Sequence, residues 1–127
     1  MTTPLYAALL ALFYIFLSVR TLRLRHKTGI SIGDGGSELM LRAMRVHANF
    51  AEYVPIALLL IFFVEATGGG KVLVHFLAGL LVLGRSLHAF GVSRSQENFR
   101  FRVSGMALTF AAIITSSVAL LGSSLLD

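Results

Sequence analysis

Four long apolar stretches, separated by short polar segments, dominate the chain. Charged residues gather between these stretches, and two of the intervals contain glycine clusters that are typical of turns. A membrane-spanning helix needs about 20 apolar residues, and each stretch is long enough to supply one. The pattern predicts an all-α integral membrane protein, a four-transmembrane-helix bundle with one domain over residues 1–127 and helices at about 4–25, 39–67, 71–92 and 101–126.

Composition supports the membrane assignment and excludes several kinds of site. Hydrophobic residues make up 56% of the chain and charged residues only 13%, whereas soluble domains average about a quarter charged. The net charge of +5 does not indicate nucleic-acid binding, because the basic residues lie between apolar stretches rather than on one polar face. We therefore expect the lipid bilayer, and no nucleic acid, as a partner. There is no cysteine, and the four histidines lack zinc-site spacing, so we expect no metal.

Basic residues mark the first and third intervals between the apolar stretches. By the positive-inside rule, these two loops are expected in the cytoplasm and both termini outside. Because the first basic cluster follows the first apolar stretch, that stretch is expected to be a retained span rather than a cleaved signal peptide. The residues concerned are Arg20, Arg23, Arg25 and Lys27 in the first interval and Arg94, Arg100 and Arg102 in the third, against Lys71 alone in the second.

The first interval also contains the run Gly33-Asp34-Gly35-Gly36. A glycine-rich loop can cradle phosphate, but this one lacks the G-x-x-x-x-G-K-[ST] spacing. We expect a flexible connection between helices, with Ser37 as the N-cap of the following helix.

The stretch from Arg42 to Pro55, at the start of the second apolar segment, carries the most polar side chains at membrane depth. Charged groups there are costly, so they normally face the protein interior, pair with one another and mark a functional site. At about 100° per residue, five polar side chains fall within about a quarter-turn arc, and His47 falls on nearly the opposite side. We interpret His47 as a helix-packing or interface residue. The stripe consists of Arg42, Arg45, Asn49, Glu52 and Tyr53.

A second polar pair lies on the third apolar segment, where Arg85 and His88 are three residues apart and share a helix face. If the two faces converge in a bundle, they form a polar pocket. An internal Arg45–Glu52 ion pair that only fixes helix packing is the simpler alternative. However, three arginines of these two helices face one carboxylate within reach, which favours an anionic ligand.

The pattern R-x-x-R-x-H-x-N-x-x-E-Y-x-P, from Arg42 to Pro55, resembles the signature of the membrane-associated proteins in eicosanoid and glutathione metabolism, the MAPEG family. This family includes microsomal glutathione transferases and the leukotriene- and prostaglandin E-forming synthases. The glycine loop and the short length are most similar to its small bacterial branch. The similarity extends over nearly the whole chain, through Arg23-Leu24-Arg25, Gly84-Arg85 with His88, and Arg100-Phe101-Arg102.

The resemblance implies a homotrimer in a bacterial inner membrane, with glutathione bound between subunits near the cytoplasmic face and a lipophilic small molecule as the second substrate. In the family, an arginine at the start of the fourth helix is proposed to stabilise the glutathione thiolate. Arg102 fits that place best, with Arg100 close behind. The positions that match glutathione contacts or their supports are Arg23 (from the adjoining subunit), Arg42, Arg45, Asn49, Glu52, Tyr53, Arg85 and His88.

Three places depart from the family pattern. Ala48 replaces a residue that is basic in some relatives, and Val92 and Met106 stand where tyrosines are expected. The leading hypothesis is a glutathione-dependent membrane transferase or peroxidase acting on lipophilic electrophiles or lipid hydroperoxides. The alternative is a non-catalytic membrane protein that binds another anionic amphiphile or lipid at the same inter-subunit site. A small multidrug exporter is disfavoured, because the first span has no acidic residue.

Overall fold

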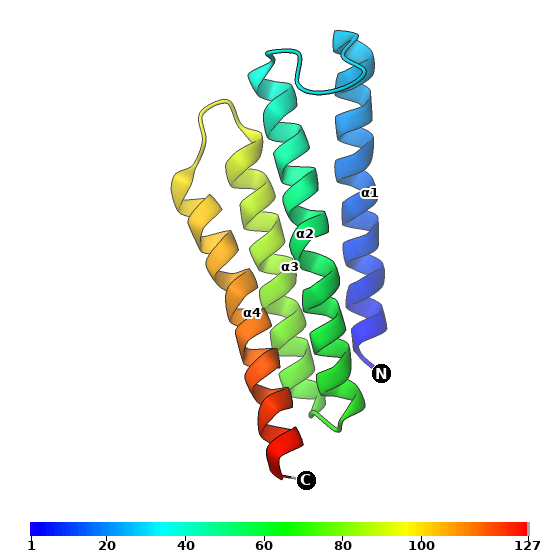
Figure 1. Cartoon of the computed structure of the whole chain (residues 1–127), viewed down its shortest axis with the longest axis vertical. Coiled ribbons are helices and arrows are strands. Elements are labelled where there is room, and N and C mark those ends of the chain that lie inside the picture. The colour runs from blue at the N-terminus through cyan, green and yellow to red at the C-terminus, as the bar shows by residue number, and fades with distance from the viewer. Residues whose placement is uncertain (127) are drawn as a thin grey trace.

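Four antiparallel helices run side by side along the long axis of the molecule (Figure 1). The computed structural model describes residues 1–126, which form α1 (Thr3–Thr28), α2 (Glu38–Ala66), α3 (Lys71–Ser93) and α4 (Phe99–Leu126) and contain no β-strand. All four helices are long and apolar enough to cross a membrane. The predicted all-α membrane bundle is confirmed. Asp127, the last residue of the predicted domain, lies outside the described residues.

Helix α1 ends three residues later than predicted. Its helical geometry is broken only at Gly29, which has a φ of 69°. Glycine adopts this left-handed conformation without a steric penalty, so it commonly follows the last residue of a helix. The basic residues at this end of α1 therefore belong to the helix and have fixed directions, rather than lying in a loop.

Side-chain caps set the beginnings of α2 and α4. The Ser37 hydroxyl accepts a hydrogen bond from the Met40 N–H at 3.3 Å, which confirms the predicted cap. The Asn98 side chain likewise accepts from the Phe101 N–H at 3.2 Å, so α4 begins two residues earlier than predicted. Such caps satisfy N–H groups that have no partner within the helix.

Close backbone contact between α3 and α4 depends on glycine. A Cβ atom added to Gly105 would lie 2.5 Å from the His88 backbone nitrogen, and one added to Gly84 would lie 2.8 Å from the Gly105 carbonyl oxygen. Small residues allow helices to approach closely where no hydrophobic effect drives their association. This contact places α4 directly against the part of α3 that carries Arg85 and His88.

The two ends of the bundle differ in chemistry. The α1–α2 and α3–α4 loops lie at one end, and both termini lie at the other (Figure 1). At the terminal end, the Glu65 carboxylate accepts hydrogen bonds from the backbone N–H groups of Thr2 and Thr3, the latter at 2.8 Å. A carboxylate at this position also complements the positive end of the α1 dipole. The basic loops share the opposite end; their cytoplasmic placement stays a prediction.

Candidate functional site

A polar pocket of about 330 Å³ opens at the basic end of the bundle. This volume lies at the lower end of the range of about 300–1,000 Å³ that is usual for small-molecule sites. The pocket brings together five of the residues that the sequence selected, from α2, α3 and α4. Its lining consists of Glu38, Leu41, Arg42, Arg45, Asn49, His88, Val92, Glu97 and Arg102.

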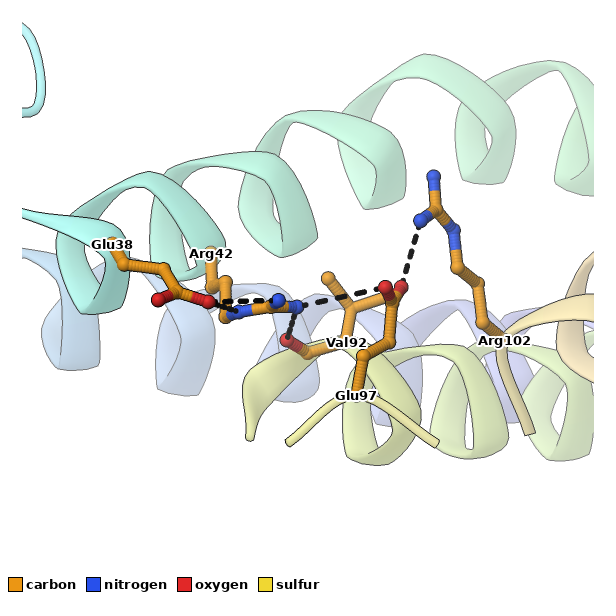
Figure 2. Close-up of polar contacts among 5 residues, drawn as sticks. All are labelled: Glu38, Arg42, Val92, Glu97 and Arg102. Carbon is orange, nitrogen blue, oxygen red and sulfur yellow. Dashed lines mark hydrogen bonds and ion pairs between the residues drawn. The ribbon is translucent and has the colours of Figure 1, made fainter. Parts of the chain in front are cut away.

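Arg42 is held in place by three neighbours (Figure 2). Its Nε donates to Glu38 Oε1 at 3.0 Å, and its Nη1 donates to the Val92 carbonyl oxygen at 3.3 Å. The same Nη1 lies 3.8 Å from Glu97 Oε2. These contacts fix the guanidinium between α2, the end of α3 and the α3–α4 loop.

Glu97 connects two arginines of different helices. Its Oε1 accepts a hydrogen bond from Arg102 Nη1 at 2.7 Å, while its other oxygen faces Arg42 (Figure 2). The side chain of Glu97 is 22% exposed, against 49% for Arg102. Glu97 therefore places a carboxylate between the guanidinium groups of Arg42 and Arg102.

The sequence analysis did not place Glu38 or Glu97 at the site. Its count of arginines against carboxylates there is therefore corrected. The pocket is lined by three arginines and two glutamates, so the excess of positive charge is smaller than the three-to-one ratio that was expected. Glu38 lies one helical turn before Arg42, a spacing that favours ion pairing and could have been recognised. Glu97 lies in a loop, where no periodicity indicates which way its side chain points.

Arg85 lies behind the pocket rather than in its lining. The side chain is 1% exposed. Its Nη1 donates to Asn49 Oδ1 at 2.5 Å, its Nε to Thr109 Oγ1 at 3.0 Å and its Nη2 to Met106 Sδ at 3.2 Å. No carboxylate pairs with it among the described residues. Arg85 thus fixes the orientation of Asn49, which does line the pocket.

The predicted stripe on α2 continues past the pocket. Arg42, Arg45 and Asn49 line the pocket, whereas Glu52 and Tyr53 lie further along the same face. Glu52 Oε1 is 3.9 Å from Arg45 Nη2, and both side chains are more than half exposed. The Tyr53 ring lies edge-on to Phe110 and 5.7 Å from Arg85 Cζ.

Three further basic residues that the sequence analysis considered, His47, Arg23 and Arg100, lie outside the pocket. His47 Nε2 is 2.9 Å from Ser18 Oγ, and its ring stacks on Tyr14 at 4.8 Å. It therefore packs between α1 and α2, which confirms the prediction that it does not belong to the stripe. Arg23 lines a separate cavity on the α1 side, and Arg100 is exposed at the start of α4.

The fold and the pocket define a four-span membrane protein with an arginine-rich polar site at one end of the bundle. The MAPEG family model matches residues 3–122, so the chain belongs to the MAPEG family. The chain is 37% identical over 119 residues to the inner membrane protein YecN of Escherichia coli K12, covering 94% of this chain and 89% of YecN. The same values hold for YecN of Escherichia coli O6:H1. These similarities support a multi-pass protein of a bacterial inner membrane.

Proposed function

We propose that this protein is a glutathione-dependent membrane transferase or peroxidase that acts on lipophilic electrophiles or lipid hydroperoxides. The observation that carries the proposal is the convergence of Arg42, Arg45 and Arg102 with Asn49 and His88 in one pocket of a MAPEG-family bundle. The family includes glutathione transferases and peroxidases. The site lies at the end of four apolar spans, where a water-soluble thiol and a membrane-dissolved substrate can meet.

The side chains of the pocket fit the chemical groups of glutathione. Arg42 and Arg45 supply guanidinium groups that bind carboxylates in bidentate fashion. Glu52, beside Arg45, is the acceptor for the ammonium group. The Asn49 carboxamide oxygen already accepts from Arg85, so its two N–H donors are the groups that it offers to a ligand.

Arg102 is the residue that we assign to the thiol. A free thiol titrates at about 8.5, and a neighbouring guanidinium favours the thiolate at neutral pH. When bound, glutathione supplies a thiolate that displaces the leaving group of an electrophile as the C–S bond forms. With a hydroperoxide, two glutathione molecules are oxidised to the disulfide while the hydroperoxide is reduced to an alcohol and water. Arg102 lines the pocket and Arg100 does not, so Arg102 is the better candidate of the two.

The proposed assembly is a homotrimer with the site between neighbouring subunits. Arg23 does not reach the pocket of its own chain and lines a cavity on α1 instead. In a trimer, an α1 helix of the adjoining subunit would bring its Arg23 to this pocket, as the family resemblance implies. Arg85 acts within this scheme as a positioning residue for Asn49.

Purified protein provides the test of the proposed chemistry. We expect glutathione to produce a thiolate absorbance with the wild-type protein, and a lipophilic electrophile or hydroperoxide to be consumed at a rate that depends on glutathione. A folded protein that shows neither the thiolate nor turnover contradicts the proposal.

A non-catalytic function is the second candidate, and one feature of the pocket favours it. Val92 lines the pocket where the family pattern has a tyrosine, and Met106 is bonded to Arg85 at the other such position. The site therefore lacks two hydroxyl groups that could assist chemistry. Native mass spectrometry of gently extracted protein distinguishes the candidates: a retained anionic amphiphile that glutathione does not displace indicates a binding protein.

A further inference from the structure

A second arginine-rich region lies on the other side of the bundle, between α1 and α3. A groove of about 320 Å³ separates these two helices. Most of its lining is apolar, and its end toward the basic loops carries arginine and serine. The α1–α3 groove is lined by Phe13, Phe16, Leu17 and Arg20 from α1 and by Ser86, Ala89, Phe90, Ser93 and Arg94 from α3.

Only some of the hydrogen-bond donors of Arg20 have a partner among the described residues. Its Nη1 donates to Ser93 Oγ at 2.6 Å, and Ser93 in turn donates to the Ala89 carbonyl oxygen. Nε and Nη2 of Arg20 are buried and have no hydrogen-bond partner among the described residues. Buried donors are nearly always paired, because leaving them unpaired costs their full desolvation energy. The guanidinium therefore keeps two unpaired donors beside the groove, which a rotation of the side chain would turn toward an acceptor bound there.

Further cations surround Arg20, and no carboxylate accompanies them. Arg94 follows Ser93 directly and lies 4.2 Å above the Phe90 ring at the mouth of the groove. A neighbouring cavity of about 300 Å³ is lined by Arg20, Arg23 and Lys27. No acidic residue within 1–126 lines either cavity.

The carboxylates of the described residues are engaged elsewhere, so they cannot neutralise this region. Glu38, Glu52 and Glu97 pair with arginines of the polar pocket. Glu65 caps α1 at the opposite end, and Asp34 accepts from the Gly36 N–H in the first loop. The α1–α3 groove is therefore complementary to a negatively charged partner.

The depth of Arg20 matches a lipid headgroup. The apolar run of α1 ends at Val19, and basic residues recur from Arg20 onwards. Phe13, Phe16 and Leu17 lie within the apolar run and continue the groove toward the middle of the bundle. Basic pockets between spanning helices at the membrane boundary bind anionic headgroups.

We propose that the α1–α3 groove binds an anionic phospholipid of the surrounding bilayer. The phosphate accepts hydrogen bonds from Arg20 and Arg94, and an acyl chain lies along Phe13, Phe16 and Phe90. The lipid completes the hydrogen bonding of Arg20 and fills the space between α1 and α3. This inference does not depend on glutathione, because the groove and the polar pocket share no lining residue.

Lipid binding to the purified protein tests the proposal directly. The protein is extracted into uncharged detergent, and binding of phosphatidylglycerol and of phosphatidylcholine is measured by native mass spectrometry. We expect phosphatidylglycerol to bind preferentially. Each basic residue near an anionic headgroup contributes about fivefold, so the Arg20→Gln/Arg94→Gln variant should bind phosphatidylglycerol about 25-fold more weakly. Lys71→Gln, which removes one charge at the opposite end of the bundle, should leave the preference unchanged.

Three outcomes overturn the proposal. They are equal binding of the two lipids by the wild-type protein, an unchanged preference in the double variant, and full displacement of phosphatidylglycerol by inorganic phosphate alone. The last outcome would mean that the region is an ion site and not a lipid groove. Because Arg20 is partly buried, the double variant is compared with Arg94→Gln alone, which changes only an exposed side chain. That single variant should weaken phosphatidylglycerol binding about fivefold.

Discussion

The two arginine-rich regions at the basic end of the bundle differ in how their charge is balanced. In the polar pocket, each lining arginine lies within 4 Å of a glutamate, and Glu97 lies between Arg42 and Arg102. Among the described residues, Arg20 and Arg94 of the α1–α3 groove have no acidic neighbour, and two nitrogens of Arg20 are buried without a partner. Arginines at one end of the bundle thus have two different surroundings, which suit two different kinds of anionic partner.

A balanced pocket suits a ligand that comes and goes. An incoming carboxylate can replace Glu97 at Arg42 and Arg102, and Glu97 can return when the ligand leaves, so neither state leaves these two guanidinium groups without an anionic partner. An unbalanced groove suits a partner that is always present, because its empty state carries the desolvation cost of unpaired donors. A bilayer supplies such a partner continuously, whereas a soluble thiol does not.

Replacing Arg102 should have the largest effect and should separate the two regions completely. In Arg102→Leu, we expect glutathione-dependent turnover to fall about 100- to 1,000-fold, the usual result of removing one preorganised charge-stabilising group. Phosphatidylglycerol binding should not change, because Arg102 lines the polar pocket and does not line the groove. Steady-state assays and native mass spectrometry on the same preparation check both statements. Retained turnover would remove Arg102 from the proposed chemistry.

Replacing Arg45 should weaken glutathione binding rather than lipid binding. A hydrogen bond to a charged group contributes about 1.5–3 kcal/mol, so Arg45→Gln should raise the glutathione dissociation constant about 10- to 100-fold. Arg45 is 58% exposed, and screening by solvent favours the lower part of this range. Equilibrium dialysis with labelled glutathione measures the change. An equal loss of lipid preference would show that the variant disturbs the whole bundle.

Removing the charge of Glu97 should strengthen glutathione binding. Glu97→Gln no longer competes with a ligand carboxylate for Arg42 and Arg102. Partly exposed ion pairs of this kind contribute up to about 1 kcal/mol, so we expect an affinity gain of about fivefold at most. The gain should shrink at high salt, where exposed charges are screened. Weaker binding in this variant would show instead that Glu97 supports the ligand, and the proposed exchange would be wrong.

The smallest effect is expected at Lys27, at the edge of the cationic region on α1. Lys27→Gln should reduce the preference for phosphatidylglycerol by about fivefold or less, since it removes one basic residue near the headgroup. Glutathione affinity should change less than the lipid preference, because Lys27 does not line the polar pocket of its own chain. Parallel titrations of both ligands make this comparison.

The sequence was sufficient for the four spans and for most of the polar pocket. Apolar stretch length predicted the helices, and the phase of the α2 stripe correctly separated His47 from Arg42, Arg45 and Asn49. His88 was expected near these residues from its helix face and Arg102 from the family resemblance alone, and the structure brings both to the pocket. Periodicity succeeds here because the side chains concerned lie on regular helices, where direction follows from residue number.

What the sequence did not predict depends on contacts between helices. Glu97 reaches the pocket because the third loop folds back onto α3, where the Asn98 N–H donates to the Gly91 carbonyl oxygen at 3.1 Å. Arg85 turns away from the pocket because Gly105 allows α4 close enough for Thr109 to accept its Nε–H. From the sequence, Arg20 indicates only on which side of the membrane the first loop lies. Its burial could not be predicted, because it follows from the packing of α1 against Ser93.

Calorimetric titration of the purified wild-type protein with glutathione tests the central claim most directly. We expect saturable binding heat that weakens as salt is raised and that decreases strongly in Arg42→Gln/Arg45→Gln, with helix content and phosphatidylglycerol preference preserved. The absence of saturable heat in folded, lipid-binding wild-type protein would contradict the assignment of the polar pocket to glutathione.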